Sequence, residues 1–592
     1  MGRVRWGRLF VALLILLLFI YGGALALGIL RPGEVPGIGA LPAPGELLNQ
    51  ATATPGAAPT TPPNPTAAPA NPTAVPPTAA PTRAAQPTPA PTTAPATRGP
   101  QPQDGGLRSE VAVPESSGTF PLGYLTIAFD KEFPPYAPVV LLHQEKLAEK
   151  RGLGVRFVPF DIEDRNRISE QRRAELLQSG GIDVILTTMN SYALWGGPQV
   201  GRVTALVGES AGADKAVVQA SAVQTFNDMR GKAFAYSDSS VSEYLLYYML
   251  RAGGVPAGEV TRFGQENLNQ AVRRYLDRQA HGVVGWTSSD MDAAVRRDDS
   301  KVLMTSEQFR VTTDVIVTGS RALETKREAL QAFHDAWFEA TKLTLEQPER
   351  AAGSMAAWSA RWTAVGSPQD LHGALQEFAQ ATLADNQTVM ADQQLPLLYE
   401  RYKESQLVWL FGGREVRRVL RADELPTVFE PAFVRRSVSN SALISTRPPV
   451  NPTFHLTAQP QVSGLTPEQQ ARLTTVAVLG VQQVQFQPGS TQLSAAARQD
   501  IEEFVIPVLR STVGTYLRVE GSAGWPAGAG LNESAVNALA FERARAVQDF
   551  IIKFGIPVER LILGTTLPRC RECQDAAAVE GDDRVVFTLV TA

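Results

Sequence analysis

A polar run from Ser237 to Glu243, between an apolar strand pattern and an apolar helix pattern, carries residue types suited to binding an anion. The first turn of a helix leaves backbone N–H groups without partners. These donors, the serine hydroxyls and the helix dipole would together favour a sulfonate, carboxylate or nitrate. Ser239 and Ser240 are the candidate contacts. The alternative is an ordinary N-cap, with Ser240 and Glu243 forming a capping box. Both interpretations stay open, and the negative charges of Asp238 and Glu243 count against an anion.

Other candidate ligand contacts lie where strand patterns end, which is where parallel α/β sheets present binding groups. Thr187 and Thr188 end one strand pattern, and Tyr136 follows another. Trp286 ends a third, so aromatic side chains on the two sides of a cleft would enclose a planar or aliphatic ligand. Asp214 is a candidate partner for an ammonium group. For each residue the alternative is structural: a hydroxyl satisfied by the next loop, a core ring, or a turn cap.

Catalytic and metal-binding patterns are absent from the sequence. The five histidines form no i, i+4 pair and no HExxH motif, so no metal site is predicted. No G-x-S-x-G, Walker or G-x-G-x-x-G motif occurs, and we expect neither a cofactor nor enzymatic activity. The two cysteines, Cys570 and Cys573, form a single C-x-x-C that favours a disulfide or free thiols over a redox centre.

The elements that must position these residues alternate between strands and helices from about residue 118. Apolar strand patterns such as LGYLTIAF, GVRFVPFDI and IDVILTT are separated by amphipathic helix patterns. This alternation predicts parallel strand pairing through helical crossovers. From Arg321 to about Arg421 the pattern is almost wholly helical. We expect two lobes, with hinges near the segments 208–222 and 302–318.

Several motifs in this region occur in the order seen in a known family. The chain reads GADKAVV from Gly212, DMRGKAFA from Asp228 and SDSSVSEYLL from Ser237. In this order they resemble the solute-binding proteins of nitrate, sulfonate and taurine ABC importers. The resemblance covers residues 119–435 and implies a two-lobed α/β periplasmic-binding-protein fold (type II), with the second lobe at about 222–304. It also implies capture of a small, anionic solute between the lobes and its delivery to an ABC permease.

Two other functional classes are disfavoured. One branch of the same fold is an enzyme, the thiamine-pyrimidine synthase, which needs a cysteine cluster for iron. This chain has no cysteine before Cys570. Nucleic-acid binding is disfavoured as well, because the formal net charge is −4 and no run rich in Lys and Arg occurs.

The C-terminal part reads VQFQPGSTQLSAAARQDIEEFVIPVL, YLRVEGSAGWPAGAG, LAFERARAVQDFIIKFGIPVERL and DDRVVFTLV. This order of strand, helix, strand, Gly-rich loop, helix and strand resembles the OmpA-like peptidoglycan-binding domain, an α+β fold, over residues 471–592, with 436–470 as a linker. The resemblance implies that Arg543 and Arg584 bind the wall peptide, Arg543 through a bidentate contact with a carboxylate. The family's acidic residue is missing, because Gly524 stands in its place. The alternative for Arg543 is a surface ion pair.

The N-terminal part predicts export. Leu9 to Leu30 form an uncharged apolar run after three arginines, and about 33 Å of helix would span a membrane. We expect residues 1–30 to be a retained signal anchor, with a cleaved signal peptide as the alternative. Residues 31–118 are rich in Pro, Ala and Thr and predict a disordered linker. The bulk of the chain would then lie outside the cytoplasm on a single-pass membrane anchor, as a solute receptor or, alternatively, as a scaffold or sensor joining membrane and peptidoglycan.

Overall fold

The computed structural model describes residues 116–592 except for 131–132, 137, 161–169, 359–367, 393, 417–418, 446–452, 458–463 and 482–483. The predicted anchor, residues 1–30, and nearly all of the predicted linker lie outside the described residues. Within the described part of the chain, no helix is both long and apolar enough to cross a membrane.

The first lobe is built on a six-stranded sheet in the order β11-β4-β10-β3-β1-β2. Its strands are β1 (Tyr124–Asp130), β2 (Gly154–Phe160), β3 (Val184–Thr188), β4 (Gly201–Ser210), β10 (Thr313–Gly319) and β11 (Phe378–Gln380). Strand β1 runs parallel to β2 and β3, as the alternation of patterns predicts. Strand β10 is antiparallel to both β3 and β4, because it enters this sheet from the other lobe.

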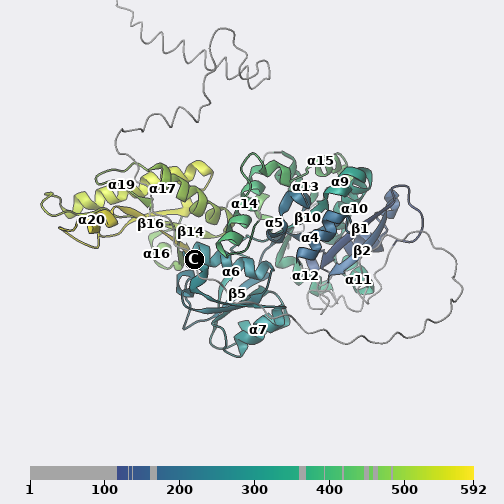
Figure 1. Ribbon diagram of the computed structural model, residues 1–592, viewed down its shortest axis with the longest axis horizontal. Helices are drawn as coiled ribbons and strands as arrows, with labels where there is room; N and C mark the ends of the chain where they lie inside the picture. The colour runs from purple at the N-terminus through teal and green to yellow at the C-terminus, as the bar shows by residue number, and fades with distance from the viewer. Residues whose placement is uncertain are drawn as a thin grey trace, which may run out of the picture. The chain divides into compact units, whose positions relative to one another are not determined.

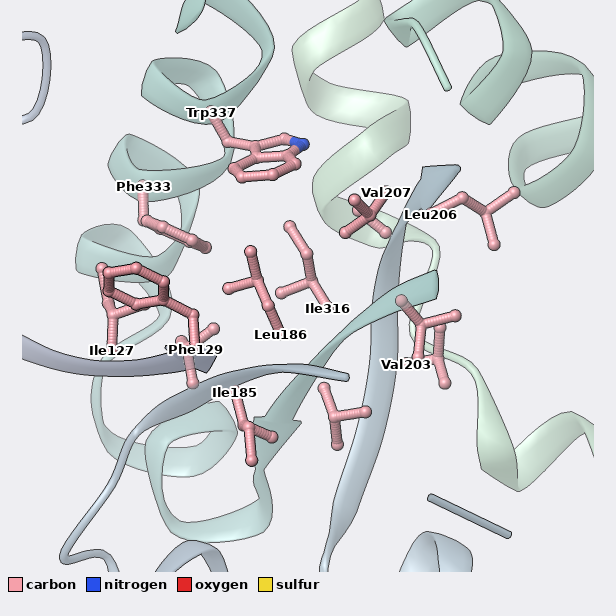
Figure 2. Close-up of a cluster of buried hydrophobic side chains, with 14 of the residues drawn as sticks. Ile127, Phe129, Ile185, Leu186, Val203, Leu206, Val207, Ile316, Phe333 and Trp337 are labelled. Atoms are coloured by element: carbon pink, nitrogen blue, oxygen red, sulfur yellow. The ribbon is translucent and has the colours of Figure 1, made fainter. Parts of the chain in front are cut away.

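Helices around this sheet bury its apolar residues. They are α3 (Pro138–Gln144), α4 (Glu170–Ser179), α5 (Met189–Trp195), α9 (Ser320–Thr325), α10 (Arg327–Glu346), α11 (Pro348–Trp358), α12 (Pro368–Gln376), α13 (Leu383–Asn386), α14 (Leu395–Phe411) and α15 (Ala432–Val438). Phe333 and Trp337 of α10 lie over Ile127, Leu186 and Ile316, which come from three neighbouring strands (Figure 2). These side chains are almost completely excluded from solvent, so the lobe has its own hydrophobic core.

The second lobe is built on a five-stranded sheet in the order β7-β6-β8-β5-β9. Its elements are β5 (Asp214–Gln219), β6 (Ala233–Ser237), α6 (Val241–Ala252), β7 (Thr261–Gln265), α7 (Leu268–Leu276), β8 (Gly282–Trp286), α8 (Ser289–Val295) and β9 (Ser300–Thr305). Alternate residues of β5 point to opposite faces of the sheet. Ala216 and Val218 pack in the hydrophobic cluster that contains residues of α6, and Val217 packs in the cluster that contains residues of α7. Accordingly, α6 and α7 lie on the two sides of β5 (Figure 1).

Two segments cross between the lobes. One joins β4 to β5 and the other joins β9 to β10, and the hydroxyls of Ser210 and Ser306 meet between them at 2.7 Å. The strands that follow these crossings, β5 and β10, pair antiparallel to their neighbours. Two α/β lobes joined by two crossing segments form a periplasmic-binding-protein-like fold, as predicted. Because β5 already belongs to the second sheet, the second lobe begins at Asp214, earlier than the expected residue 222.

The C-terminal module, residues 464–592, contains a sheet in the order β12-β16-β14-β15, with β13 also paired to β16. Its elements are α16 (Pro467–Ala471), β12 (Thr474–Val478), β13 (Val484–Gln485), α17 (Ala495–Asp500), α18 (Ile506–Ser511), β14 (Thr515–Gly521), α19 (Glu533–Ile551), β15 (Leu561–Thr565), α20 (Ala576–Asp582) and β16 (Arg584–Thr591). The segment between β15 and the last strand contains the short helix α20.

The C-terminal module shares buried apolar contacts with the second lobe. One hydrophobic cluster contains Val223 and Phe226 of the lobe together with Val476 and Ala477 of the module. Nearby, the amide of Asn227 donates to the carbonyl of Val478 at 2.8 Å and accepts from its N–H at 2.8 Å. Part of the predicted linker is packed as well, because Phe454 is completely buried. The described residues of 436–470 are thus not a free spacer.

Candidate functional site

A cavity of about 90 Å³ lies between the two lobes, beside the crossing segments. The residues that line it come from the ends of strands, from the helices that follow them, and from the crossings. They are Asp130, Phe133, Tyr136, Arg173, Thr187, Thr188, Ser191, Ser210, Asp214, Ser240, Val241, Trp286, Thr312 and Asp314. The cavity has room for more than one water-sized group, since about 10–15 Å³ of space of this kind holds one water.

The structure brings together all but one of the residues predicted to bind solute. Those that line the cavity are Tyr136, Thr187, Thr188, Asp214, Ser240 and Trp286. Ser239 instead lines a separate, open groove of about 820 Å³. A ligand contact for the six remains a prediction, and their shared location agrees with the rule that strand ends present binding groups.

The Ser237–Glu243 turn adopts the N-cap arrangement. Ser240 is the N-cap of α6, and its hydroxyl accepts from Ser242 N–H at 3.2 Å and donates to Ser237 O at 2.7 Å. Ser239 takes a left-handed conformation, with φ 53°, and donates its hydroxyl to Asp238 at 2.9 Å. The carboxylate of Glu243 accepts from Ser239 N–H at 2.7 Å, rather than from Ser240 as in the expected capping box. A buried carboxylate therefore already occupies the start of this helix.

Tyr136 and Asp314 form a buried polar pair in the cavity wall. The hydroxyl of Tyr136 donates to Oδ1 of Asp314 at 2.7 Å, and both side chains are almost inaccessible to solvent. Asp314 lies opposite Thr188 in the pairing of β10 with β3. Burial and the nearby charges of Asp214 and Asp130 raise the pKa of Asp314 well above its usual value.

Asp214 begins β5 directly after the first crossing. Its N–H donates to Ser306 Oγ at 3.0 Å, and its side chain is 4% exposed. Among the described residues, Oδ2 of Asp214 has no hydrogen-bond partner. Burial raises the pKa of Asp214 to about 6, although the hydroxyls of Ser210 and Thr312 hold it down. At pH 8 this group therefore carries a negative charge inside the cavity. Trp286 lies opposite it in the pairing of β5 with β8.

Sequence reasoning missed several of the lining residues, above all Asp130, Arg173 and Asp314. Arg173 of α4 donates to both carboxylate oxygens of Asp130, at 3.2 and 3.4 Å, so these two charges compensate each other. Asp130 could have been predicted as a lining residue from its place at the end of a strand, because it is the last residue of β1. A single acid in the apolar run TDVIVTG was the available signal for Asp314.

A larger cavity, of about 410 Å³, lies between the lobes and the C-terminal module. Its arginines are engaged by protein groups. Arg560 donates to the carbonyls of Thr515 and Leu509, and Arg310 pairs with the buried Glu209 at 3.3 Å. With its cations occupied in this way, this cavity presents mainly apolar walls, and we do not assign the solute to it.

Arg543 does not occupy the exposed position that a wall-binding role requires. It is completely buried, and its guanidinium donates to Asp583 at 2.5 Å and to the carbonyls of Ser522, Ser490 and Gln487 at 2.9, 2.9 and 3.1 Å. The expectation of a guanidinium presented to a carboxylate outside the protein is therefore wrong, and so is the alternative of a surface ion pair.

The surroundings of Gly524 explain why this position of the Gly-rich loop holds a glycine rather than an acidic residue. A Cβ atom at Gly524 would lie 2.4 Å from the carbonyl oxygen of Val579 in α20, so no side chain fits there. The N–H of Gly524 donates to Asp583 at 2.8 Å, the same carboxylate oxygen that Arg543 contacts. Arg584 is half-buried and donates to the carbonyl of Gly581 at 2.8 Å.

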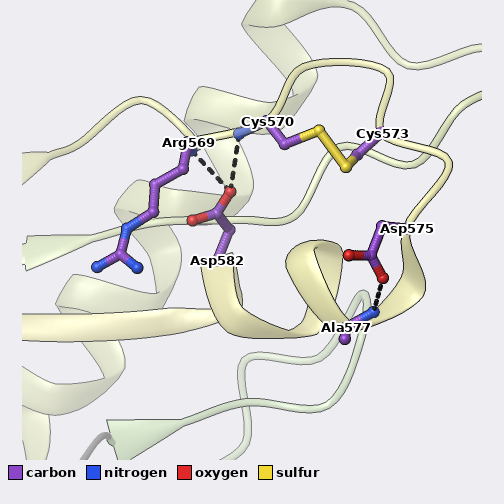
Figure 3. Close-up of a disulfide and its surroundings, with 6 residues drawn as sticks. All are labelled: Arg569, Cys570, Cys573, Asp575, Ala577 and Asp582. Carbon is purple, nitrogen blue, oxygen red and sulfur yellow. Dashed lines mark hydrogen bonds between the residues drawn. A yellow bond between two sulfur atoms is a disulfide. The ribbon is translucent and has the colours of Figure 1, made fainter.

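Cys570 and Cys573 are joined by a disulfide in the loop between β15 and α20 (Figure 3). Asp582, at the end of α20, accepts from the backbone N–H groups of Arg569 and Cys570 at 2.7 and 3.3 Å. The pair thus staples a loop that is bonded to the Gly-rich segment, because Cys573 N–H donates to the carbonyl of Trp525 at 2.8 Å and Ala527 N–H donates to the carbonyl of Cys573 at 2.9 Å. Within the described residues, no cluster of three or more His, Cys, Asp or Glu side chains is arranged to hold a metal ion.

Comparisons with known proteins found one matching family model and likenesses to solved structures. Residues 167–351 match the family model described as NMT1/THI5 like. The chain is similar to the crystal structure of the periplasmic aliphatic sulphonate binding protein of Escherichia coli, with 17% identity, 52% of this chain and 92% of that chain covered, and a TM-score of 0.39. The chain is also similar to the crystal structure of the periplasmic nitrate-binding protein of Synechocystis PCC 6803, with 12% identity and a TM-score of 0.39. This likeness covers 56% of this chain and 93% of that chain. No curated protein matches the chain.

Proposed function

We propose that this protein is an extracytoplasmic receptor that binds a small solute between its two lobes for uptake by an ABC-type importer. The observation that carries the proposal is the cavity at the lobe junction, where side chains from the strand ends of both sheets converge, Thr187 and Thr188 from one and Asp214 and Trp286 from the other. Its lining, a few polar groups beside aromatic walls, is of the kind found in ligand sites.

The crossing segments supply a mechanism for entry and release. A hinge that changes backbone angles in two short connections separates the lobes without disturbing either core. Ser210 and Ser306 lie side by side in the two connections, and Ser306 also accepts from the N–H groups of Gly212 and Asp214. Opening would therefore move Asp214 and Trp286 away from Thr188 and Tyr136 and expose the cavity.

Membrane attachment is part of the proposal. Residues 9–30 would anchor the chain, and residues 31–118 would act as a tether that keeps the receptor near a permease in the same membrane. A tether raises the effective concentration of the receptor at its partner without any new contact. Delivery of solute to a permease follows from analogy at the level of the fold, and no residue of the cavity identifies that partner.

Contact between the C-terminal module and peptidoglycan is a separate proposal. It rests on the order of strands and helices in residues 471–592 and no longer on Arg543. Retention of the full chain on purified sacculi tests it, with Arg584→Ala expected to weaken retention and Arg545→Ala, at an exposed position of α19, expected to leave it unchanged. Absence of retention would leave the module as a packing partner of the second lobe.

The proposed receptor function is tested by thermal unfolding of the full chain with a panel of nitrate, sulfonates, taurine, carboxylates and small amines. A ligand present at 100 times its dissociation constant adds about 2.7 kcal/mol to the free energy of unfolding. We expect at least one member to raise the unfolding temperature. A panel without any such effect would favour the alternative of a scaffold between membrane and wall.

A further inference from the structure

We propose that the solute held between the lobes is a small organic amine, bound as its ammonium form with Asp214 as the charge partner. The inference rests on the proposed function, because it names the chemical class that the same cavity takes. It replaces the anionic solute expected from the family resemblance.

One carboxylate oxygen of Asp214, Oδ2, lacks a donor among the described residues, although the hydroxyls of Ser210 and Thr312 lie beside the carboxylate. Its side chain is 4% exposed and lines the cavity, and its Oδ2 has no hydrogen-bond partner among the described residues. Buried polar atoms in native proteins are almost always hydrogen-bonded, and a buried carboxylate oxygen without a donor is costly. A ligand N–H group placed in the cavity would supply the missing donor. Oδ2 of Asp314, in the same wall, likewise has no partner in the described part of the chain.

The charges around the cavity disfavour an anion. Arg173 is the cation among the described lining residues, and it is paired with Asp130 at 3.2 Å. The start of α6 is already served by the carboxylate of Glu243, which accepts from Ser239 N–H and pairs with Arg414 at 2.6 Å. An anion in the cavity would therefore meet the charge of Asp214 without a compensating cation, whereas an ammonium group would neutralise it.

The aromatic side chains complete a site for an ammonium group. Trp286 faces Asp214 across neighbouring strands of the second lobe. From the first lobe, Phe133 and Tyr136 line the same cavity, with ring centroids 4.9 Å apart in an edge-to-face arrangement. Cations bind favourably over aromatic faces, most of all over tryptophan. A carboxylate beside such rings recognises an alkylammonium group, and the cavity of about 90 Å³ has room for a small one.

Calorimetric titration of the full chain at pH 8 with ethylammonium, acetate and ethanol, which are similar in size, tests this inference. We expect binding of ethylammonium, weakened on the order of 10- to 100-fold in Asp214→Asn, because a hydrogen bond to a charged group is lost. Asp298→Asn removes the same charge from an exposed site of the same lobe and should leave the affinity unchanged. If Asp214→Asn does not fold, Trp286→Leu replaces it, with weaker ethylammonium binding expected.

The outcomes separate this inference from the proposed function. Acetate binding more tightly than ethylammonium overturns the inference and leaves a solute receptor in place. Ethylammonium binding that is equally strong in Asp214→Asn also overturns it. Absence of binding by all three ligands, together with absence of any thermal shift in the wider panel, overturns both.

Discussion

The hydroxyl of Tyr136 donates a 2.7 Å hydrogen bond to Oδ1 of Asp314, and this contact joins the loop after the first strand to the segment that returns from the second lobe. Both groups are buried in the cavity wall. The bond therefore links the binding surface of the first lobe to one of the two hinges, and it positions the Tyr136 ring against Phe133.

Tyr136→Phe should lower the free energy of unfolding by about 1–3 kcal/mol, because it leaves a buried carboxyl oxygen without its donor. Tyr124→Phe is the matched control. The hydroxyl of Tyr124 donates to the carbonyls of Ser116 and Gly118 at a partly exposed site, where water can replace it. Denaturant unfolding of both variants compares the costs. Equal losses of unfolding free energy in the two variants would mean that burial adds nothing to the contribution of the Tyr136–Asp314 hydrogen bond.

The pKa of Asp214 predicts a dependence of amine binding on pH. Because this pKa is raised to about 6, the carboxylate is present above pH 6 and is lost as the pH falls through that value. Affinity for ethylammonium should then fall, approaching about tenfold per pH unit below the pKa. Calorimetric titrations between pH 8 and 5 check this. The charged and titratable groups near Asp214 are Asp314, Glu377 and Lys215. A pH-independent affinity would contradict the assignment of Asp214.

The raised pKa of Asp214 also predicts how the stability of the solute-free protein depends on pH. A carboxyl whose pKa is raised in the folded state stabilises folding below its unfolded pKa, and that contribution is lost as the pH rises through about 6. The loss amounts to about 3 kcal/mol for a shift of this size. Asp214→Asn should therefore flatten the dependence of the free energy of unfolding on pH between 4 and 7. An unchanged slope would show that Asp214 is not desolvated in solution.

Arg543→Ala should destabilise the C-terminal module by about 3–5 kcal/mol, because it leaves the buried carboxylate of Asp583 without a cation. Arg545→Ala, two residues along the same helix, removes an exposed arginine near Glu542 and should change the free energy by less than about 1 kcal/mol. Thermal unfolding monitored by circular dichroism measures both. Similar unfolding temperatures for the two variants would contradict a structural role for Arg543.

Loss of the Cys570–Cys573 disulfide should lower the free energy of unfolding by less than the Arg543→Ala substitution does. Cys570 and Cys573 are three residues apart, so the closed loop is short and the loss of chain entropy on cross-linking is worth about 2 kcal/mol or less. Thermal unfolding of Cys570→Ser/Cys573→Ser against the wild type tests this. A loss well above that range would mean that the bond holds the contact of α20 with Gly524 as well as its own loop.

The sequence predicted the elements of the two lobes better than their pairing. Apolar runs such as IDVILTT and GVVGW are strands β3 and β8, because strand length and β-branched content are local properties. The antiparallel direction of β5 and β10 was missed, since it depends on the chain crossing between lobes. In the C-terminal module, β15 was missing from the predicted order, which went from the helix pattern ending at Leu561 directly to the last strand.

For the candidate site, the position of a residue at the end of a strand was enough to predict which residues reach the cavity. The partners that these and other residues find far along the chain could not be predicted. Thr187, Thr188 and Trp286 end their strands and reach the cavity together. The burial of Arg543 could not be predicted, because its partner Asp583 lies 40 residues further along the chain. The proposal of an ammonium ligand in place of the expected anion depends on a contact of the same kind, because Arg173 and Asp130 compensate each other only once the fold brings α4 and β1 together.

Hydrogen exchange of the full chain, with and without the panel member that gives the largest thermal shift, tests solute binding between the lobes most directly. We expect slower exchange in both 184–195 and 282–291, the strand ends and following helices that face the cavity from the two lobes. Protection confined to one lobe, or found instead around 507–514 beside the larger cavity, would contradict binding between the lobes.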